Sequence, residues 1–202
     1  LTLCGSAVGE AAASYAAGLV AYADGCVVRD CAVYVEVSAA GTHAGGVAAY
    51  ISNGTLLENC SSYGGVTGTS GVGGLVGVSY SVEDRIVGCA NFGAVTSTKS
   101  GTYGTGGLVG RLAGTLTQSA NYGTVTSADR YTGGLAGYAT ARNKTTLTLC
   151  RSAGDVNAES TDERAACGGA VGYAQNLIWG GCVGGDGLEP LGRSGSVREL
   201  SV

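Results

Sequence analysis

The sequence predicts an all-β fold, a parallel β-helix (β-solenoid) of about six to seven coils. A block of the form Gly-Gly-aliphatic returns with a repeat of about 28 residues, for example at 73–77 and 106–110. Between these blocks, single residue types recur in register, which is typical of stacked coils. Short stretches rich in β-branched residues are bounded by glycine, and 38 glycines in 202 residues leave no room for long helices.

The glycine block divides the chain into coils. Its second glycine occupies five clear positions, and a weaker copy reads Ala-Gly-Leu-Val at 17–20. The intervals between copies range from 27 to 35 residues, which indicates one unit with insertions. Insertions in solenoids lie in loops along particular edges, and we expect any binding there. The five positions are Gly46, Gly74, Gly107, Gly134 and Gly169.

Within a unit we expect three short strands, which in the third copy lie around 75–76, 86–89 and 94–96. Each strand would stack on its equivalent at the usual spacing of about 4.8 Å. The Asn-Phe-Gly segment 91–93 and its equivalents are predicted to turn a corner through glycine at positive φ. The paired glycines indicate a second corner or a close approach between backbones.

A cysteine column anchors the second half of the unit. We interpret it as a structural ladder, because cysteine is a small apolar residue that fits a narrow interior. A row of thiols that binds soft metal or forms disulfides is the alternative. Cβ atoms about 4.8 Å apart would exceed the usual disulfide range of about 3.5–4.5 Å, and the sequence has no Cys-x-x-Cys pair. The ladder comprises Cys4, Cys31, Cys60, Cys89, Ser119, Cys150 and, with a one-residue slip, Cys182.

Two cysteines, Cys26 and Cys167, lie off this column, and we predict that they are the more reactive or cross-linking thiols.

Aromatic residues form a second column, three positions after the cysteine anchor. We expect either a stack at a corner of the coil or an exposed stripe that stacks on sugars. This aromatic ladder comprises Tyr34, Tyr63, Phe92 and Tyr122. The same two alternatives apply to a partial row formed by Tyr22, Tyr50, Tyr138 and Tyr173, which Val78 and Arg111 interrupt.

Charge and hydropathy exclude some partners. The net charge of −4 argues against nucleic acid, which attracts basic proteins. The chain has no run of about 18 apolar residues, so we expect no membrane insertion. The N-terminal residues 1–4 lack the features of a signal peptide and an initiator methionine, and we expect a processed product or a piece of a longer chain.

No catalytic site or cofactor is predicted. The single histidine, His43, has no acidic residue within ten positions other than Glu36. One acidic cluster stands beside Arg164, and we interpret it as a solvated loop, with a weak Ca²⁺ site as the alternative. The cluster comprises Asp155, Glu159, Asp162 and Glu163.

The unit resembles a known repeat. Gly-Gly-Leu-Val-Gly, a loop, then Ile-x-x-Cys-x-Asn-aromatic-Gly-x-Val is similar to the GLUG motif of bacterial surface proteins and of non-catalytic parts of some IgA-specific metallopeptidases. The resemblance covers residues 1–185, and the third to fifth copies match best. It implies a bacterial extracellular or cell-surface location and a structural or adhesive role. It implies no activity.

We therefore expect a β-solenoid domain over 1–185 and a non-repeat tail over 186–202, which caps that end or covers a neighbouring subunit. The predicted function is a non-enzymatic structural or adhesive module whose partner is a protein, through self-association or a host surface, or a glycan. One alternative is a filament that stacks head to tail through open solenoid ends. Another is an accessory module of a large secreted peptidase.

Overall fold

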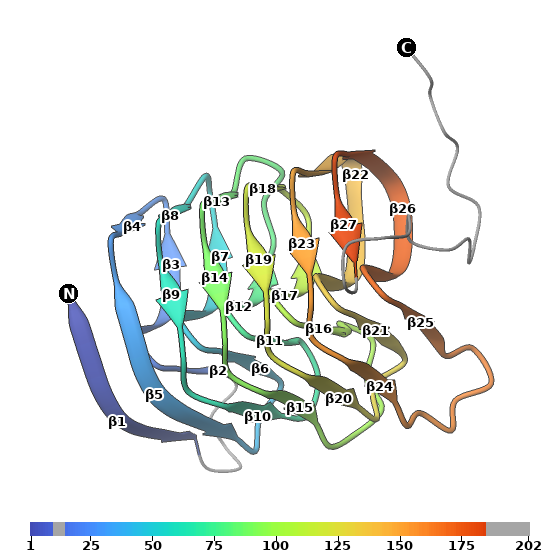
Figure 1. Cartoon of the computed structure of the whole chain (residues 1–202), viewed down its shortest axis with the longest axis horizontal. Helices are drawn as coiled ribbons and strands as arrows, with labels where there is room; N and C mark the ends of the chain where they lie inside the picture. Colours follow the sequence, from blue (N-terminus) through green and yellow to red (C-terminus); the bar gives the residue numbers. More distant parts are fainter. Residues whose placement is uncertain (10–14, 185–202) are drawn as a thin grey trace.

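The computed structural model describes residues 1–9 and 15–184, and it confirms the predicted fold class. The chain winds into a β-solenoid of six coils, and strands of neighbouring coils pair in parallel (Figure 1). Among the described residues, no helix is long and apolar enough to cross a membrane. The predicted tail at 186–202 lies outside the described residues.

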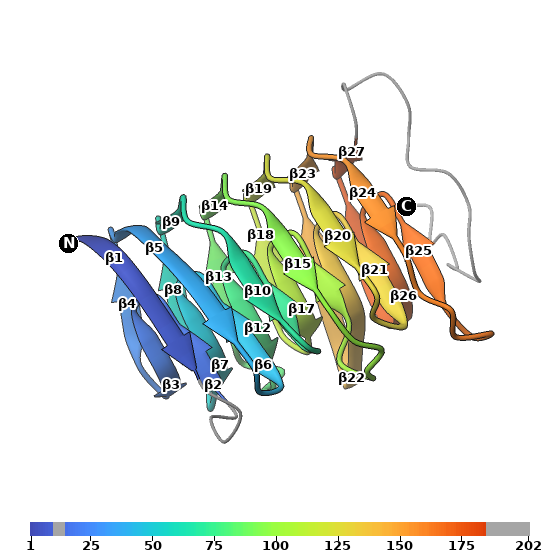
Figure 2. The same ribbon diagram turned by 90° about the horizontal axis from the view of Figure 1, so that it is seen from below.

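Three sheets form the faces of the solenoid. We name them sheet A, with eleven strands, sheet B, with six, and sheet C, with ten. Each coil adds to all three, so equivalent strands lie side by side in chain order (Figure 2). A residue's place in the repeat therefore decides which face it joins.

The third coil shows the unit in full. It contains β11 (Val72–Gly73), β12 (Val76–Ser79), β13 (Arg85–Val87), β14 (Ala90–Asn91) and β15 (Val95–Ser97). The three predicted strands correspond to β12, β13 and β15. The other two strands were not predicted, because two residues are too few for a recognisable pattern.

The other coils repeat this order with small changes. Strand β1 (Thr2–Gly9) precedes the first coil, which contains β2 (Tyr15–Ala17), β3 (Val20–Asp24), β4 (Val27–Arg29) and β5 (Ala32–Ala39). The second contains β6 (His43–Gly45), β7 (Ala48–Ser52), β8 (Leu56–Glu58), β9 (Ser61–Ser62) and β10 (Val66–Gly68). The fourth contains β16 (Thr105–Gly106), β17 (Val109–Leu112), β18 (Thr115–Thr117), β19 (Ala120–Asn121) and β20 (Val125–Ser127). The fifth contains β21 (Tyr131–Gly133), β22 (Ala136–Thr148), β23 (Arg151–Ser152) and β24 (Val156–Ala158), and the sixth β25 (Ala166–Gly168), β26 (Val171–Gly180) and β27 (Val183–Gly184).

The core is a set of aliphatic columns that run along the solenoid axis. Ile86 pairs in register with Leu57 on one side and Leu116 on the other, and all three are fully buried. Val95 likewise pairs with Val66 and Val125. Each coil thus buries its aliphatic side chains against copies of themselves, and burial of such side chains is the main stabilising term.

The corner before the cysteine column is a single residue at positive φ in every coil. The prediction that Gly93 and its equivalents supply positive φ was wrong. A Cβ at Gly93 would instead overlap the backbone oxygen of Gly64 in the preceding coil, so glycine is required there for close approach. The residues at positive φ are Asp30, Asn59, Gly88, Gln118, Leu149 and Gly181.

The paired glycines also allow close approach. A Cβ at Gly74 would overlap the amide of buried Asn91 and the carbonyl oxygen of Gly107. The Asn91 amide donates from Nδ2 to Asn121 Oδ1 (2.9 Å) and to Gly93 O (2.8 Å). Asn121 makes the equivalent bond to its own glycine, so the two amides form a short ladder between coils.

Candidate functional site

The cysteine ladder lies at the corner that follows each positive-φ residue. The Cys89 thiol donates to Val87 O (3.3 Å), two residues earlier, and Ser119 Oγ makes the same bond to Thr117 O (2.8 Å). The side chain therefore closes the corner as well as filling space, which explains why serine substitutes for cysteine. The same bond is made by Cys31, Cys60, Cys150 and Cys182.

Cys4 was wrongly placed in this ladder. It lies opposite Tyr34 and is exposed. The reason is the register of the strand pair: Thr2 of β1 pairs with Ala32 of β5, so the position equivalent to Cys31 falls on Leu1, three residues before Cys4. The alternation of β1 directs Leu3 and Ala7 toward the core and Cys4 outward.

Cys182 needs no slip to join the ladder. On the N-terminal side of the cysteines, Leu147 pairs with Trp179, and on the C-terminal side Arg151 pairs with Val183. Both pairs have the same separation in sequence as Cys150 and Cys182. Cys182 therefore lies in register with Cys150.

All eight cysteines are free thiols. The hydrogen bond shared with Cys60, together with burial, raises the pKa of Cys89, so this thiol is protonated at neutral pH. Within 1–9 and 15–184, no group of three His, Cys, Asp or Glu residues could hold a metal ion.

The two thiols predicted to lie off the ladder, Cys26 and Cys167, are both exposed, as is Cys4. Cys26 follows β3 in the first coil, and Cys167 lies in β25 in the sixth. Five coil steps of about 4.8 Å separate them along the axis, or about 24 Å. They cannot form a disulfide with each other within one chain.

The aromatic ladder of Tyr34, Tyr63, Phe92 and Tyr122 is a regular stack, which we call the corner stack. Successive ring centroids are 4.3, 4.8 and 5.0 Å apart, and the planes differ by at most 10°. Each ring is 38–46% exposed. The rings cover one another's faces, so mainly their edges and the two end faces meet solvent.

The remaining tyrosines form a second aromatic cluster, which we call the tyrosine surface. Its column on sheet C includes the partial row, with Val78 in register with Tyr50 and Arg111 in register with Tyr138. Four further tyrosines join it from loops and from the starts of sheet B strands. The tyrosine surface comprises Tyr15, Tyr22, Tyr50, Tyr80, Tyr103, Tyr131, Tyr138 and Tyr173, so the two clusters contain all 11 tyrosines of the chain.

The rings of the tyrosine surface meet at varied angles. Tyr15 contacts Tyr50 edge to face at 75°, whereas Tyr22 and Tyr50 stack at 7°. At the other end, Tyr131 and Tyr173 meet at 37°. Tyr22 and Tyr80 are 51% and 58% exposed. Ring faces as well as edges are therefore available to a ligand.

Arg111 lies between Tyr80 and Tyr103 on one side and Tyr138, its neighbour in register, on the other. Its guanidinium carbon lies 5.2 Å from the Tyr80 ring centre and 5.7 Å from that of Tyr103. These distances are within cation–π range. Arg111 Nε is buried without a hydrogen-bond partner.

His43 lies beneath these rings and is buried. Its ring centre is 4.8 Å from that of Tyr103 and 5.3 Å from that of Tyr15. Burial lowers the pKa of His43, and the charge of Arg111 adds to the shift, so the imidazole is neutral at pH 7. Its Nδ1 has no hydrogen-bond partner.

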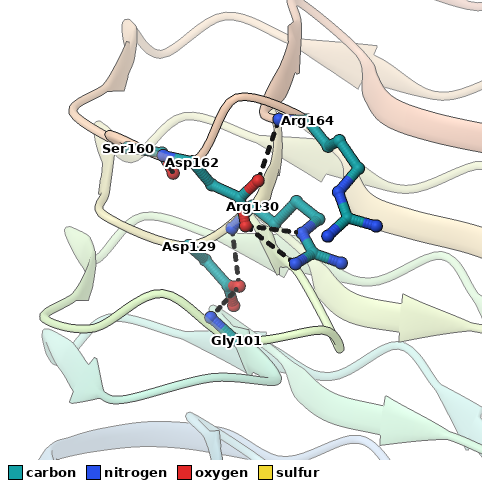
Figure 3. Close-up of polar contacts among 6 residues, drawn as sticks. All are labelled: Gly101, Asp129, Arg130, Ser160, Asp162 and Arg164. Carbon is teal, nitrogen blue, oxygen red and sulfur yellow. Dashed lines mark hydrogen bonds and ion pairs between the residues drawn. The ribbon is translucent and has the colours of Figure 1, made fainter.

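The predicted acidic loop is joined to the preceding coil through an ion pair between Asp162 and Arg130 (Figure 3). Asp162 receives the Arg130 guanidinium at 2.7 and 2.9 Å and the backbone N–H of Arg164 at 2.8 Å. The backbone N–H and the guanidinium lower the pKa of Asp162. Arg130 also lies over the Tyr131 ring at 6.0 Å. The other three acidic residues of the cluster, Asp155, Glu159 and Glu163, are exposed.

Buried Asp129 continues this network into the neighbouring loop. Its Oδ1 accepts the backbone N–H groups of Gly101 and Arg130, both at 2.8 Å (Figure 3). Three loops on one edge are thereby held together, next to Tyr103 and Tyr131.

Sequence reasoning missed half of the tyrosine surface. Tyr80 and Tyr103 lie in loops, and Arg111 counted only as an interruption. Tyr15 and Tyr131 lie in a sheet B column that the alignment did not identify, where Tyr15 pairs with His43 and Tyr131 with Ala166. An available signal was that every tyrosine outside the corner stack lies in or beside a sheet B or sheet C segment.

The comparisons with known proteins are few. Neither a model of a known protein family nor a curated protein matches the sequence. Among solved structures, the fold is similar to that of a candidate immunoglobulin A1 protease from Bacteroides ovatus, with a TM-score of 0.51 and 22% identity. The match covers 79% of this chain and 49% of that one, so this chain spans about half the length of the protease. The likeness shows a shared fold.

Proposed function

We propose that this chain is a non-catalytic binding module of a secreted or cell-surface bacterial protein and that it binds glycans. The tyrosine surface carries this proposal. Eight tyrosines, Arg111 and His43 gather along one side of a solenoid whose other exposed aromatic column is a closed stack. Aromatic residues gathered in this way on a surface indicate a binding site.

The chemistry of tyrosine suits a sugar. A pyranose ring has an apolar C–H face bordered by hydroxyl groups, and tyrosine offers an apolar ring face with a hydrogen-bonding hydroxyl. Burial raises the pKa of Tyr50 to about 12, so this hydroxyl keeps its proton and can donate. The surface extends from the first coil to the sixth, about 24 Å at the usual strand spacing, which suits an extended chain.

The comparison with the Bacteroides ovatus protein favours a second role, as an accessory module of a larger secreted peptidase. The two roles are compatible, because a glycan-binding module can hold a peptidase near a glycosylated target. Head-to-tail assembly remains a prediction, and light scattering of the purified chain at several concentrations tests it.

The proposal is tested by affinity electrophoresis in gels that contain neutral or acidic polysaccharides. We expect the wild type to be retarded by at least one polymer. The triple variant Tyr50→Ala/Tyr80→Ala/Tyr103→Ala should bind at least tenfold more weakly, because each aromatic contact contributes about 0.5–1.5 kcal/mol. The matched control is Tyr63→Ala/Phe92→Ala in the corner stack, which should keep its affinity. Retardation by no polymer, or equal loss in both folded variants, contradicts the proposal.

A further inference from the structure

The environment of Arg111 distinguishes it within the tyrosine surface. Its strand neighbours in register are Val78 and Tyr138, so neither provides an opposite charge. Arg111 forms no ion pair with any residue that the structure describes. The flanking rings of Tyr80 and Tyr103 hold the guanidinium in place.

Arg130 provides a comparison in the same surface. It also lies over a tyrosine ring, that of Tyr131, but Asp162 neutralises it with two short contacts. Arg111 therefore provides the unneutralised positive charge near the middle of the tyrosine surface. A partly buried guanidinium with an unpartnered Nε is costly to retain unless a ligand uses its charge.

We infer that Arg111 binds the carboxylate of an acidic sugar whose ring lies on the neighbouring tyrosines. This inference rests on the proposed glycan binding and specifies the class of glycan. The planar guanidinium matches a carboxylate in geometry and can donate two parallel hydrogen bonds. Tyr80 and Tyr103 already fix its plane, so little side-chain freedom is lost on binding.

An acidic sugar fits better than an acidic peptide. The tyrosine surface is built from tyrosine, arginine and buried histidine, and Val78, the aliphatic residue in its sheet C column, is fully buried. It offers ring faces and hydroxyls, and the aliphatic side chain of Val78 is not available to a peptide. Its row along the axis places tyrosines on both sides of Arg111, where they can contact further sugars of the same polymer.

The experiment compares polygalacturonate with its methyl ester, which has the same sugar without free carboxylates. We expect wild-type protein to bind polygalacturonate at least tenfold more tightly than the ester. Arg111→Gln should abolish the preference, so that the affinity for polygalacturonate falls to that for the ester measured with the same variant. Arg111→Lys should restore only part of the difference, since it keeps the charge but loses the planar fork. The control Arg151→Gln, at an exposed arginine of β23 on sheet A, should change neither affinity.

A second arm distinguishes uronic from sialic acids as the source of the carboxylate. A sialylated glycoprotein is tested before and after sialidase treatment, and a preference for the untreated form that Arg111→Gln abolishes supports the inference in the same way. Poly-glutamate tests for a peptide partner. Binding of poly-glutamate as tight as that of the acidic sugars overturns the inference.

The possible results distinguish this inference from the proposed glycan binding on which it rests. Equal binding of polygalacturonate and its ester overturns the role of Arg111 but leaves glycan binding in place. Binding of no polysaccharide or glycoprotein overturns both. Thermal unfolding of each variant shows whether it is folded, and an Arg111→Gln variant that is folded yet keeps full preference for acidic sugar also overturns the inference.

Discussion

The corner stack and the tyrosine surface use the same kind of side chain with opposite results. In the corner stack, each coil supplies one ring in register, and the planes stay within 10° of one another. In the tyrosine surface, rings from two sheets and from loops meet at up to 78°. The regular column covers its own ring faces, whereas the irregular cluster leaves faces free.

This difference shows where function can arise in a repeat protein. In a regular column, each side chain packs against the equivalent side chain of the next coil, so its contacts are made within the protein. Departures such as Arg111, Tyr80 and Tyr103 have no copy of themselves in the next coil, and on the proposed function they are the residues that contact the ligand. Stability should therefore depend on the regular positions and binding on the irregular ones.

The largest expected effect concerns the regular columns and their contribution to stability. Asn91→Ala should lower the free energy of unfolding by about 2–4 kcal/mol, because it removes three buried hydrogen bonds: the two that Nδ2 donates, to Asn121 Oδ1 and Gly93 O, and the one that Oδ1 accepts from the Gly93 N–H. Urea denaturation measures it, and Asn157→Ala in exposed β24 is the control with little change. The folded Asn91→Ala variant should bind glycans as the wild type does, and a loss of binding would break the comparison.

Tyr63→Ala should destabilise the chain by about 1–2 kcal/mol, because it removes two stacked contacts at 4.3 and 4.8 Å. Tyr63→Phe keeps both contacts and should be nearly neutral in the same denaturation experiment. If Tyr63→Ala weakens glycan binding more than the triple variant of the tyrosine surface, the roles assigned to the two clusters are wrong.

His43 gives the tyrosine surface a pH dependence that the corner stack lacks. Its pKa is lowered in the folded state, so below its ordinary value of about 6.5 the unfolded chain binds more protons. The contribution of His43 to the free energy of unfolding should be constant above that pH and fall below it, with a slope of at most about 1.4 kcal/mol per pH unit. His43→Phe should remove this component of the slope, and urea denaturation from pH 5 to 8 measures it. An unchanged slope would show that His43 is not buried as described.

The smallest effect sharpens the comparison by making the chain more regular. Ser62 occupies the position of Asn91 one coil earlier, and its buried Oγ has no hydrogen-bond partner. Ser62→Asn should extend the amide ladder by one coil and stabilise the chain by about 0.5–1 kcal/mol. Ser62→Ala should be nearly neutral in the same measurement. Destabilisation by Ser62→Asn would show that this coil has no room for the amide.

The sequence predicted what depends on position along the repeat. The Leu57, Ile86 and Leu116 column and the Val66, Val95 and Val125 column follow from alignment alone, because parallel coils in register place equal positions side by side. The two-residue strands and the corner residues do not follow from the alignment. At the corners, Gln118 and Leu149 are not residue types typical of positive φ.

The tyrosine surface could be predicted only in part. Tyr22 and Tyr50 share a column, but Tyr15 reaches Tyr50, and Tyr103 reaches His43, from other parts of the coil. Their approach depends on how sharply each coil bends at its glycines, which column alignment does not give. The placement of Cys4 was wrong because β1 pairs with β5 in a register three residues away from the one that the alignment predicts.

The parallel pairing of the strands also gives the molecule a direction. No two-fold axis can relate its two ends, and even the amide of Asn91 donates toward the C-terminal coil. The sheet C column offers its groups in one fixed order: Tyr22, Tyr50, Val78, Arg111, Tyr138, Tyr173. A polysaccharide has chemically distinct reducing and non-reducing ends. If the proposed glycan binding is right, we expect a chain along this column to prefer one orientation, with its reducing end at the same end of the solenoid.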